Sequence, residues 1–322
     1  MEKFGSKGSG MTMRLWPTAL RSRARLLCLF ALAAPLTPQE TVFRVDVRLV
    51  RVLATVKNAA GELVGSLSKE EFSIFDNGVQ QSIAVFEKHT EQPLSVALLM
   101  DTSASTAKDL KYEVDSASHF LKALFGAGNP KDSAALYSFN YEVVRRNHFT
   151  RNHGPLDHSL RQLKSEAGTS LYDGIFLAAE DLQNRDGRHV IVVVTDGGDT
   201  TSVKDFHAAL NAAQLADAVI YPILVIPIAN DAGRNVGGEN ALTSLAKGTG
   251  GRVFTPSVGN ALDAAFAEIL RDLRTQYLLG YYPSNVPPSE NRFHRLEVRT
   301  NRTDLRVSAR NGYYGSSTPR EK

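Results

Sequence analysis

The sequence has only one cysteine, Cys28, among its 322 residues. A single cysteine cannot form an internal disulfide framework, and the rest of the chain can offer neither a thiolate zinc site nor a cysteine nucleophile. The chain is long enough to bury a core without such cross-links. Its 43% of hydrophobic and 22% of charged residues are ordinary for a globular protein. Packing must therefore supply the stability.

Glycine-rich phosphate-binding patterns are also missing. No G-x-G-x-x-G follows the first apolar strand of the α/β segment described below, and the chain has no P-loop. These turns supply the backbone N–H groups that cradle nucleotide phosphates. Their absence argues against a nucleotide as substrate or cofactor.

A strong excess of positive charge is lacking outside the N-terminus. The formal net charge is +3, but residues 1–34 hold six basic residues and one acid, which leaves 31 basic and 33 acidic residues for the rest. The remainder is therefore slightly acidic, and it offers no basic surface of the kind that binds nucleic acid. We expect no nucleic-acid partner.

The basic N-terminal segment has the pattern of an export signal. Three arginines, at 21, 23 and 25, precede an apolar run at 26–34 with Ala-x-Ala at 31–33. This pattern predicts a signal peptide over 1–34 and an exported protein, periplasmic or secreted. The run is too short for an ordinary membrane span, so we expect no membrane insertion of the mature chain. The alternative is an N-terminal anchor that is not cleaved.

The next segment, 41–90, has the pattern of β-strands. Residues 41–57 read as one long strand whose apolar residues change parity near residue 50, which predicts a β-bulge or a change of sheet. Apolar stretches at 72–75 and 83–86 flank Asp76-Asn77-Gly78, a strong hairpin signal. We therefore predict an N-terminal β segment.

From residue 92 to residue 275, strand and helix patterns alternate. Strands are predicted near 94–100, 134–139, 143–149, 190–195, 219–226 and 252–254. Helices are predicted near 106–125, 156–164, 171–184, 203–217, 239–248 and 259–274. Such alternation predicts a Rossmann-like, doubly wound α/β domain with a mainly parallel sheet covered on both faces. The short connection at 140–142 predicts an antiparallel edge strand.

The chain returns to β patterning over 276–315. Strands are predicted at 276–282, 293–300 and 305–310, and residues 316–322 read as a loose tail. An isolated hairpin is only marginally stable, so we predict that 276–315 pairs with 41–90 to build one accessory β domain. The alternative is two separate β appendages.

Polar side chains follow two of the predicted buried strands. The segment 101–105 reads D-T-S-A-S and comes directly after the apolar run 94–100, and Asp196 follows the apolar run 190–195. Thr169 lies where a loop meets the next predicted helix. The carboxyl ends of parallel strands are where open α/β sheets bind ligands. Carboxylate and hydroxyl oxygens suit Mg²⁺, Mn²⁺ or Ca²⁺ better than zinc.

The order D-x-S-x-S, then T, then D-G resembles the metal-ion-dependent adhesion site of the von Willebrand factor type A (VWA) family. The resemblance covers roughly 92–275 and implies the VWA fold there. The flanking patterns, E-F…D-N-G at 71–78, G-Y-Y-P at 280–283 and R-N-G-Y-Y at 310–314, resemble a VWA-related family first described from Acidobacteria.

The resemblance implies roles for five residues. Ser103 and Ser105 would bind the cation directly, and Thr169 would bind it directly or through water. Asp101 and Asp196 would act mostly through bound waters. Because few carboxylates would bind the ion directly, the ion would stay electron-poor. It would keep an open position for an acidic group of a partner. The ion expected is Mg²⁺, or alternatively Mn²⁺ or Ca²⁺.

Simpler interpretations of the same residues remain open. Ser105 could cap the helix that follows it, and Asp101 and Asp196 could be ordinary loop carboxylates. Asp199 could support the site or only charge a helix N-terminus. A water held by the metal could also act as a nucleophile. However, no His or Lys lies directly beside Asp101 or Asp196 in the sequence to act as acid or base.

The sequence therefore predicts an exported, non-enzymatic, adhesion-type protein. It would use a divalent cation to capture a carboxylate on a protein or glycan partner. The main alternative is a structural scaffold of the cell envelope without metal-gated binding. A metal-dependent hydrolase is a more distant alternative.

Overall fold

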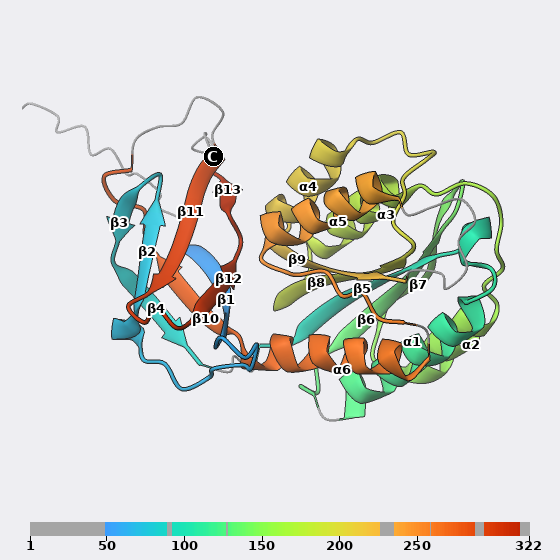
Figure 1. Cartoon of the computed structure of the whole chain (residues 1–322), viewed down its shortest axis with the longest axis horizontal. Coiled ribbons are helices and arrows are strands. Elements are labelled where there is room, and N and C mark those ends of the chain that lie inside the picture. Colours follow the sequence, from blue (N-terminus) through green and yellow to red (C-terminus); the bar gives the residue numbers. More distant parts are fainter. Residues whose placement is uncertain are drawn as a thin grey trace, which may run out of the picture. The chain divides into compact units, whose positions relative to one another are not determined.

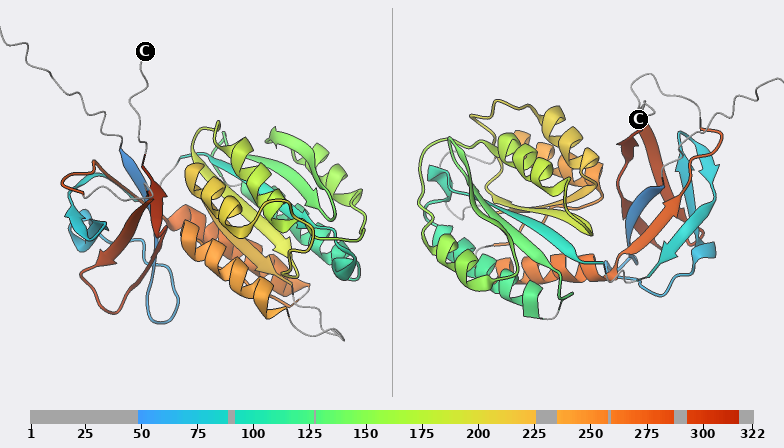
Figure 2. Two further views of the ribbon diagram at one scale, coloured as in Figure 1. Left: turned by 90° about the horizontal axis from the view of Figure 1, so that it is seen from above. Right: turned by 180° about the vertical axis from the view of Figure 1, so that it is seen from behind.

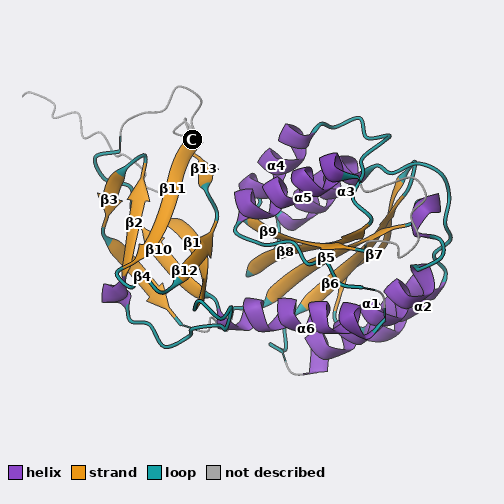
Figure 3. Cartoon of the chain, viewed as in Figure 1, coloured by secondary structure: helices purple, strands orange, loops and turns teal. Residues whose placement is uncertain are grey.

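The computed structural model describes residues 49–88, 92–126, 128–225, 235–257, 259–286 and 293–315. The predicted signal peptide, the first part of the predicted strand 41–57 and the tail 316–322 lie outside the described residues. The described chain forms an α/β region and an all-β region (Figure 3). None of the described helices is both long and apolar enough to span a membrane.

A five-stranded sheet in the order β7-β6-β5-β8-β9 forms the centre of the α/β region. Its strands are β5 (Leu94–Asp101), β6 (Ser133–Phe139), β7 (Val143–Thr150), β8 (Arg188–Thr195) and β9 (Ala218–Leu224). β5 is parallel to β6 and β8, β9 is parallel to β8, and β7 is the antiparallel edge. Every residue of the four parallel strands is buried, as expected for a sheet covered on both faces.

Three helices cover each face of this sheet (Figure 1). One face carries α1 (Leu110–Gly126), α2 (His153–Arg161) and α6 (Asn260–Thr275), and the other carries α3 (Leu171–Leu182), α4 (Phe206–Leu215) and α5 (Val236–Thr249). Neighbouring residues of β5 pack on opposite faces of the sheet: Leu98 packs on the α1 side and Leu99 on the α3 side. The predicted doubly wound α/β fold is confirmed.

The predicted strand at 252–254 is wrong in extent. Only Phe254 bridges to β9: its N–H donates to the Pro222 carbonyl at 2.9 Å, and its carbonyl accepts from Leu224 at 2.7 Å. Pro256 follows two residues later and has no N–H to continue a ladder. The segment therefore touches the sheet edge without adding a strand.

The all-β region consists of two four-stranded antiparallel sheets, seen from two further sides in Figure 2. One has the order β12 (Arg306–Ala309), β1 (Val50–Lys57), β10 (Tyr277–Tyr281), β4 (Ile83–Glu87). The other has β13 (Gly312–Tyr314), β11 (Phe293–Thr300), β2 (Phe72–Asp76), β3 (Val79–Gln81). Each sheet mixes strands from before and after the α/β region, and both contribute to one core. The predicted accessory β domain built from both flanks is confirmed.

The predicted hairpin has a different second strand. Asn77 and Gly78 adopt positive φ angles of 47° and 82°, as a tight two-residue turn requires. The turn joins β2 to the short β3, whereas residues 83–87 form β4 in the other sheet, beside β10. The local pattern could not reveal this, because β10 lies about 190 residues further along the chain.

Candidate metal centre

Asp101 lies at the carboxyl end of the central strand β5 and is completely buried. Its Oδ1 accepts a hydrogen bond from the Ser103 N–H at 2.8 Å, and its Oδ2 accepts one from the Thr195 hydroxyl at 2.6 Å. Thr195 is the last residue of β8, the strand next to β5. The carboxylate is therefore held between the ends of two parallel strands.

The Asp101 carboxylate is poorly compensated electrostatically. Burial raises its pKa to about 6, although hydrogen bonds from Thr195 and Ser103 act in the opposite direction, and the nearby negative Asp196 raises it further. Burial without a cationic partner disfavours the ionised form. A cation bound beside Asp101 would remove this penalty.

The two serines of the 101–105 segment lie together. The Ser103 and Ser105 hydroxyl oxygens are 3.0 Å apart, in the short 3₁₀ turn that begins after Ser103. The Thr106 hydroxyl donates to the backbone carbonyls of Asp101 and Ser103 and holds the turn in place. The Ser105 hydroxyl thus pairs with Ser103, several residues before α1 begins. Ser105 therefore does not cap α1.

Thr169 is buried in a separate loop that is tied to the loop after β8. Its N–H donates to the Thr200 hydroxyl at 3.0 Å, and its carbonyl accepts from the Thr200 and Thr201 N–H groups. The preceding Gly168 has φ +87°, and a Cβ there would lie 2.9 Å from the Tyr141 backbone. Only glycine fits this close approach, which fixes the course of the Thr169 loop.

Asp196 directly follows β8 and is half-buried. The next residue, Gly197, has φ +108°, a backbone conformation that favours glycine. Asp199, by contrast, accepts a hydrogen bond from the Tyr172 N–H in the first turn of α3 at 3.2 Å. Asp199 therefore serves the helix N-terminus, which was one of its two predicted roles.

The structure thus places Asp101, Ser103, Ser105 and Asp196 at the carboxyl ends of two adjacent strands, and backbone contacts tie the Thr169 loop to the segment after Asp196. Over the described parts of the chain, no three His, Cys, Asp or Glu side chains gather as a metal-holding group. A cation here would therefore depend on hydroxyls and waters as well as carboxylates. Such hard oxygens fit Mg²⁺, Mn²⁺ or Ca²⁺.

Glu113 belongs to this region, and the sequence analysis missed it. It lies in the first turn of α1, is completely buried, and neither carboxylate oxygen has a hydrogen-bond partner. Burial raises its pKa well above the usual range, and the negative charges of Asp101, Asp109 and Asp196 raise it further. One signal was available: Glu113 shares the core-facing spacing of the apolar residues 117, 120, 121 and 124 on α1.

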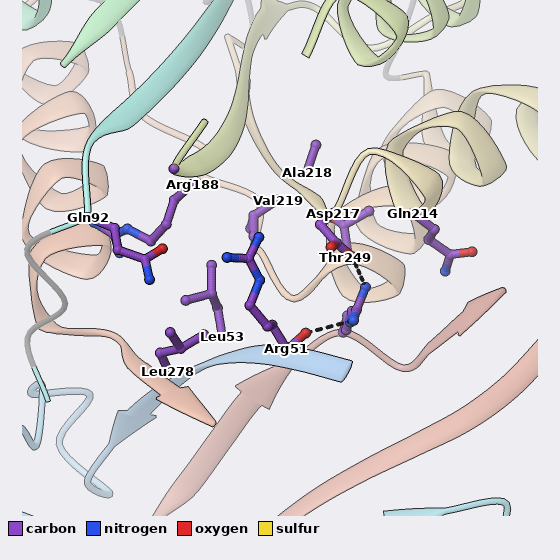
Figure 4. A pocket seen from close by; sticks show the side chains of 12 residues that line it. Arg51, Leu53, Gln92, Arg188, Gln214, Asp217, Ala218, Val219, Thr249 and Leu278 are labelled. Carbon is purple, nitrogen blue, oxygen red and sulfur yellow. Dashed lines mark hydrogen bonds and ion pairs between the residues drawn. The ribbon is translucent and has the colours of Figure 1, made fainter. Parts of the chain in front are cut away.

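A separate pocket has a different character (Figure 4). Leu53 and Leu278 line it from the β region, and Ala218 and Val219 from the start of β9. Three of its charged side chains already have partners within the chain. Arg310 pairs with Asp217 and also donates to the Arg51 carbonyl, while Arg188 donates to the Leu273 carbonyl at the end of α6. None of the predicted site residues lines this pocket, so the strand ends are the better candidate site.

This domain is doubly wound and carries hydroxyl and carboxylate groups at the carboxyl ends of its central strands, where open α/β sheets bind ligands. Residues 96–198 match the family model described as von Willebrand factor type A domain. The match includes most of β5, the whole of β8 and all five predicted site residues. The chain therefore contains a von Willebrand factor type A domain.

Two solved structures are similar to this chain at low sequence identity. The von Willebrand factor domain of the type V pilus tip protein Mfa5 from Porphyromonas gingivalis is 17% identical, with a TM-score of 0.48; the match covers 56% of this chain and 95% of that one. The conserved hypothetical protein BatB from Bacteroides thetaiotaomicron is 19% identical, with a TM-score of 0.45 and coverages of 56% and 100%. No curated protein matches the chain.

Proposed function

We propose that this chain is an exported, non-enzymatic binding protein that captures a carboxylate of a protein or glycan partner through a divalent cation. Ser103, Ser105 and Thr169 would hold the ion with hydroxyl oxygens, and Asp101 and Asp196 would hold its waters. The bound ion would supply Lewis acidity toward the partner's carboxylate. Mg²⁺ is the expected ion, with Mn²⁺ or Ca²⁺ as alternatives.

The observation that carries this proposal is the environment of Asp101. Its carboxylate is fully buried, accepts only neutral donors from Ser103 and Thr195, and has Asp196 as a negative neighbour. A buried charge without a counter-charge is costly unless an ion or a proton neutralises it. The adjacent Ser103 and Ser105 hydroxyls offer neutral oxygens for that ion.

The proposed partner group follows from the charge of this oxygen set. Three hydroxyls and two carboxylates that act mainly through water neutralise a divalent ion only partly. An anionic oxygen from outside is then the preferred occupant of an open position. This accounts for a carboxylate ligand without any catalytic acid or base.

Calorimetric titration of the purified chain with Mg²⁺ and Mn²⁺ tests the ion. Saturable binding is expected for the wild type and should be lost in Asp101→Ala, because the substitution removes a carboxylate and the acceptor of Ser103 and Thr195. Asp186→Asn is the matched control, since it removes an exposed carboxylate shortly before β8, at the opposite end of that strand. Absence of binding by the wild type would contradict the proposal and favour a scaffold without a metal.

Water-proton relaxation of the Mn²⁺-loaded protein tests the open position. Acetate, the simplest carboxylate probe, should lower the relaxivity because it displaces a water from the ion. Formamide, a neutral probe of similar size, is the control and should have little effect. Unchanged relaxivity with saturating acetate would contradict carboxylate capture, and turnover of simple esters by the loaded protein would instead support a hydrolase.

A further inference from the structure

Glu113 is a buried acid whose position no packing or pairing interaction explains. Both carboxylate oxygens are buried and unpartnered, while most buried polar groups in proteins form at least one hydrogen bond. Glu113 lies on the core-facing side of α1, because residues with the same helical spacing, such as Ala117 and Leu121, pack in the core against the sheet. An apolar residue would fit this position at far lower cost.

The charges that act on Glu113 are all negative. Asp101 and Asp196 belong to the candidate metal centre. Hydrogen bonds connect the start of α1 to the 101–105 segment: the Glu113 N–H donates to the Asp109 carbonyl at 3.1 Å, the Asp109 N–H donates to the Thr106 carbonyl at 3.0 Å, and the Thr106 hydroxyl donates to the Asp101 carbonyl. Of the ion pairs found among the described residues, none includes Glu113. The first turn of α1 supplies a small positive potential from its free N–H groups, but this is worth far less than a full counter-charge.

We propose that Glu113 is a third anionic group of the cation site, which acts on the ion from the α1 side without binding it directly. The inference rests on the proposed function, because it assumes that a cation binds beside Asp101. Direct binding is not part of it, because over the described parts of the chain no three acidic or histidine side chains are gathered closely enough to hold a metal together. Glu113 is therefore a positioning residue.

This role has a consequence for how the ion is held. A third carboxylate strengthens the attraction of the protein for a divalent ion without adding a direct ligand, so the chain should retain its ion more firmly in the absence of a partner. A site with only Asp101 and Asp196 would hold the ion more weakly. The cost of bringing Glu113 into the core is then offset only in the ion-bound state.

The test is Glu113→Gln, which removes the charge and keeps the shape. Mn²⁺ titration of the purified variant should show binding weakened about tenfold or more, because a full charge acting through a partly buried region is lost. Without metal, the melting temperature at neutral pH should rise by about 2 to 4 °C, because the free-energy cost of burying or protonating this acid is removed. Glu180→Gln, an exposed change of the same kind on α3, should alter neither quantity.

Each outcome decides the inference. Wild-type affinity in Glu113→Gln would overturn it and leave the proposed function standing. Weaker binding together with a lower melting temperature without metal would also overturn it, since the variant would then have damaged the fold. Absence of Mn²⁺ binding in the wild type would refute the proposed function, and the role of Glu113 with it.

Discussion

At the scale of single residues, Asp101 and Glu113 are buried acids with different surroundings. Asp101 has two hydrogen-bond donors, whereas Glu113 has none, and both share Asp196 as a negative neighbour. Sequence alone placed Asp101 correctly, because a carboxylate directly after an apolar strand must lie at its end. The sequence analysis missed Glu113, because a single acid in an amphipathic helix usually faces solvent, although its spacing matched the core-facing residues of α1.

The raised pKa of Asp101 predicts a pH dependence of the metal-free protein. A carboxyl group whose pKa is raised to about 6 by burial binds its proton more tightly in the folded than in the unfolded state. Its contribution to stability is therefore fully present below about pH 4 and is lost as pH rises through about 6. Urea unfolding between pH 4 and 7 should show this loss without metal.

The matched measurement is the same series with saturating Mg²⁺. The ion compensates the ionised carboxylate, so stability should no longer fall between pH 4 and 7. The Asp101→Asn variant without metal should show a weaker dependence on pH in this window, because the contribution of Asp101 is removed and that of Glu113 remains. A metal-free wild type whose stability rises steadily over the window would contradict the assigned direction of the shift.

At the scale of secondary-structure elements, Asp76 joins strands from both ends of the chain. This buried residue of β2 accepts hydrogen bonds from Tyr281 of β10 at 2.7 Å, Tyr313 of β13 at 2.8 Å and His294 of β11 at 2.9 Å. Burial and the Asp76 carboxylate raise the pKa values of both tyrosines. The sequence showed Asp76 only as the start of a turn.

Asp76→Ala should lower the free energy of unfolding by about 3 kcal/mol, because the buried Tyr281 and the partly buried His294 and Tyr313 lose their acceptor at once. Urea unfolding followed by circular dichroism measures the change. Asp304→Ala is the control, since Asp304 is exposed and pairs only with the neighbouring Arg302, and it should change stability by less than about 0.5 kcal/mol. Equal effects of the two substitutions would show that Asp76 does not join the strands.

The elements that sequence placed well are those with a strong local pattern. The largely apolar strands β5 and β8 and the periodic helices α1 and α6 begin and end within about four residues of their predicted limits. The prediction of the pairing of β4 was wrong because a strand's partner depends on residues far away in sequence. The prediction of a strand at 252–254 was wrong because apolar character alone does not provide the hydrogen-bond partners of a strand.

At the scale of the whole molecule, Gln276 lies at the junction where α6 leads into β10. It is buried, and its side-chain N–H₂ donates to the Thr55 hydroxyl at 3.2 Å and to the Tyr221 hydroxyl at 3.3 Å. Its side-chain oxygen accepts from Arg188 at 3.2 Å. One amide thus connects β1 of the β region with β8 and β9 of the α/β region.

Gln276→Leu should lower the free energy of unfolding by about 2 kcal/mol, because Thr55, Tyr221 and Arg188 lose a buried partner. Hydrogen exchange should show the loss in both β1 and β9, since both strands contact the amide. Gln80→Leu, an exposed change on β3, should leave both strands unaffected. Faster exchange in β1 alone would contradict a shared junction.

The sequence by itself determined the strand and helix order, the α/β class and the positions of Asp101 and Asp196 after their strands. These features depend on local patterns of apolar and turn residues, which persist in any compact arrangement of the chain. Tertiary structure alone decided the pairing of β1 with β10, the convergence of three strands on Asp76, and the burial of Glu113 without a partner. The physical reason is that burial and pairing depend on groups brought together from up to about 240 residues apart.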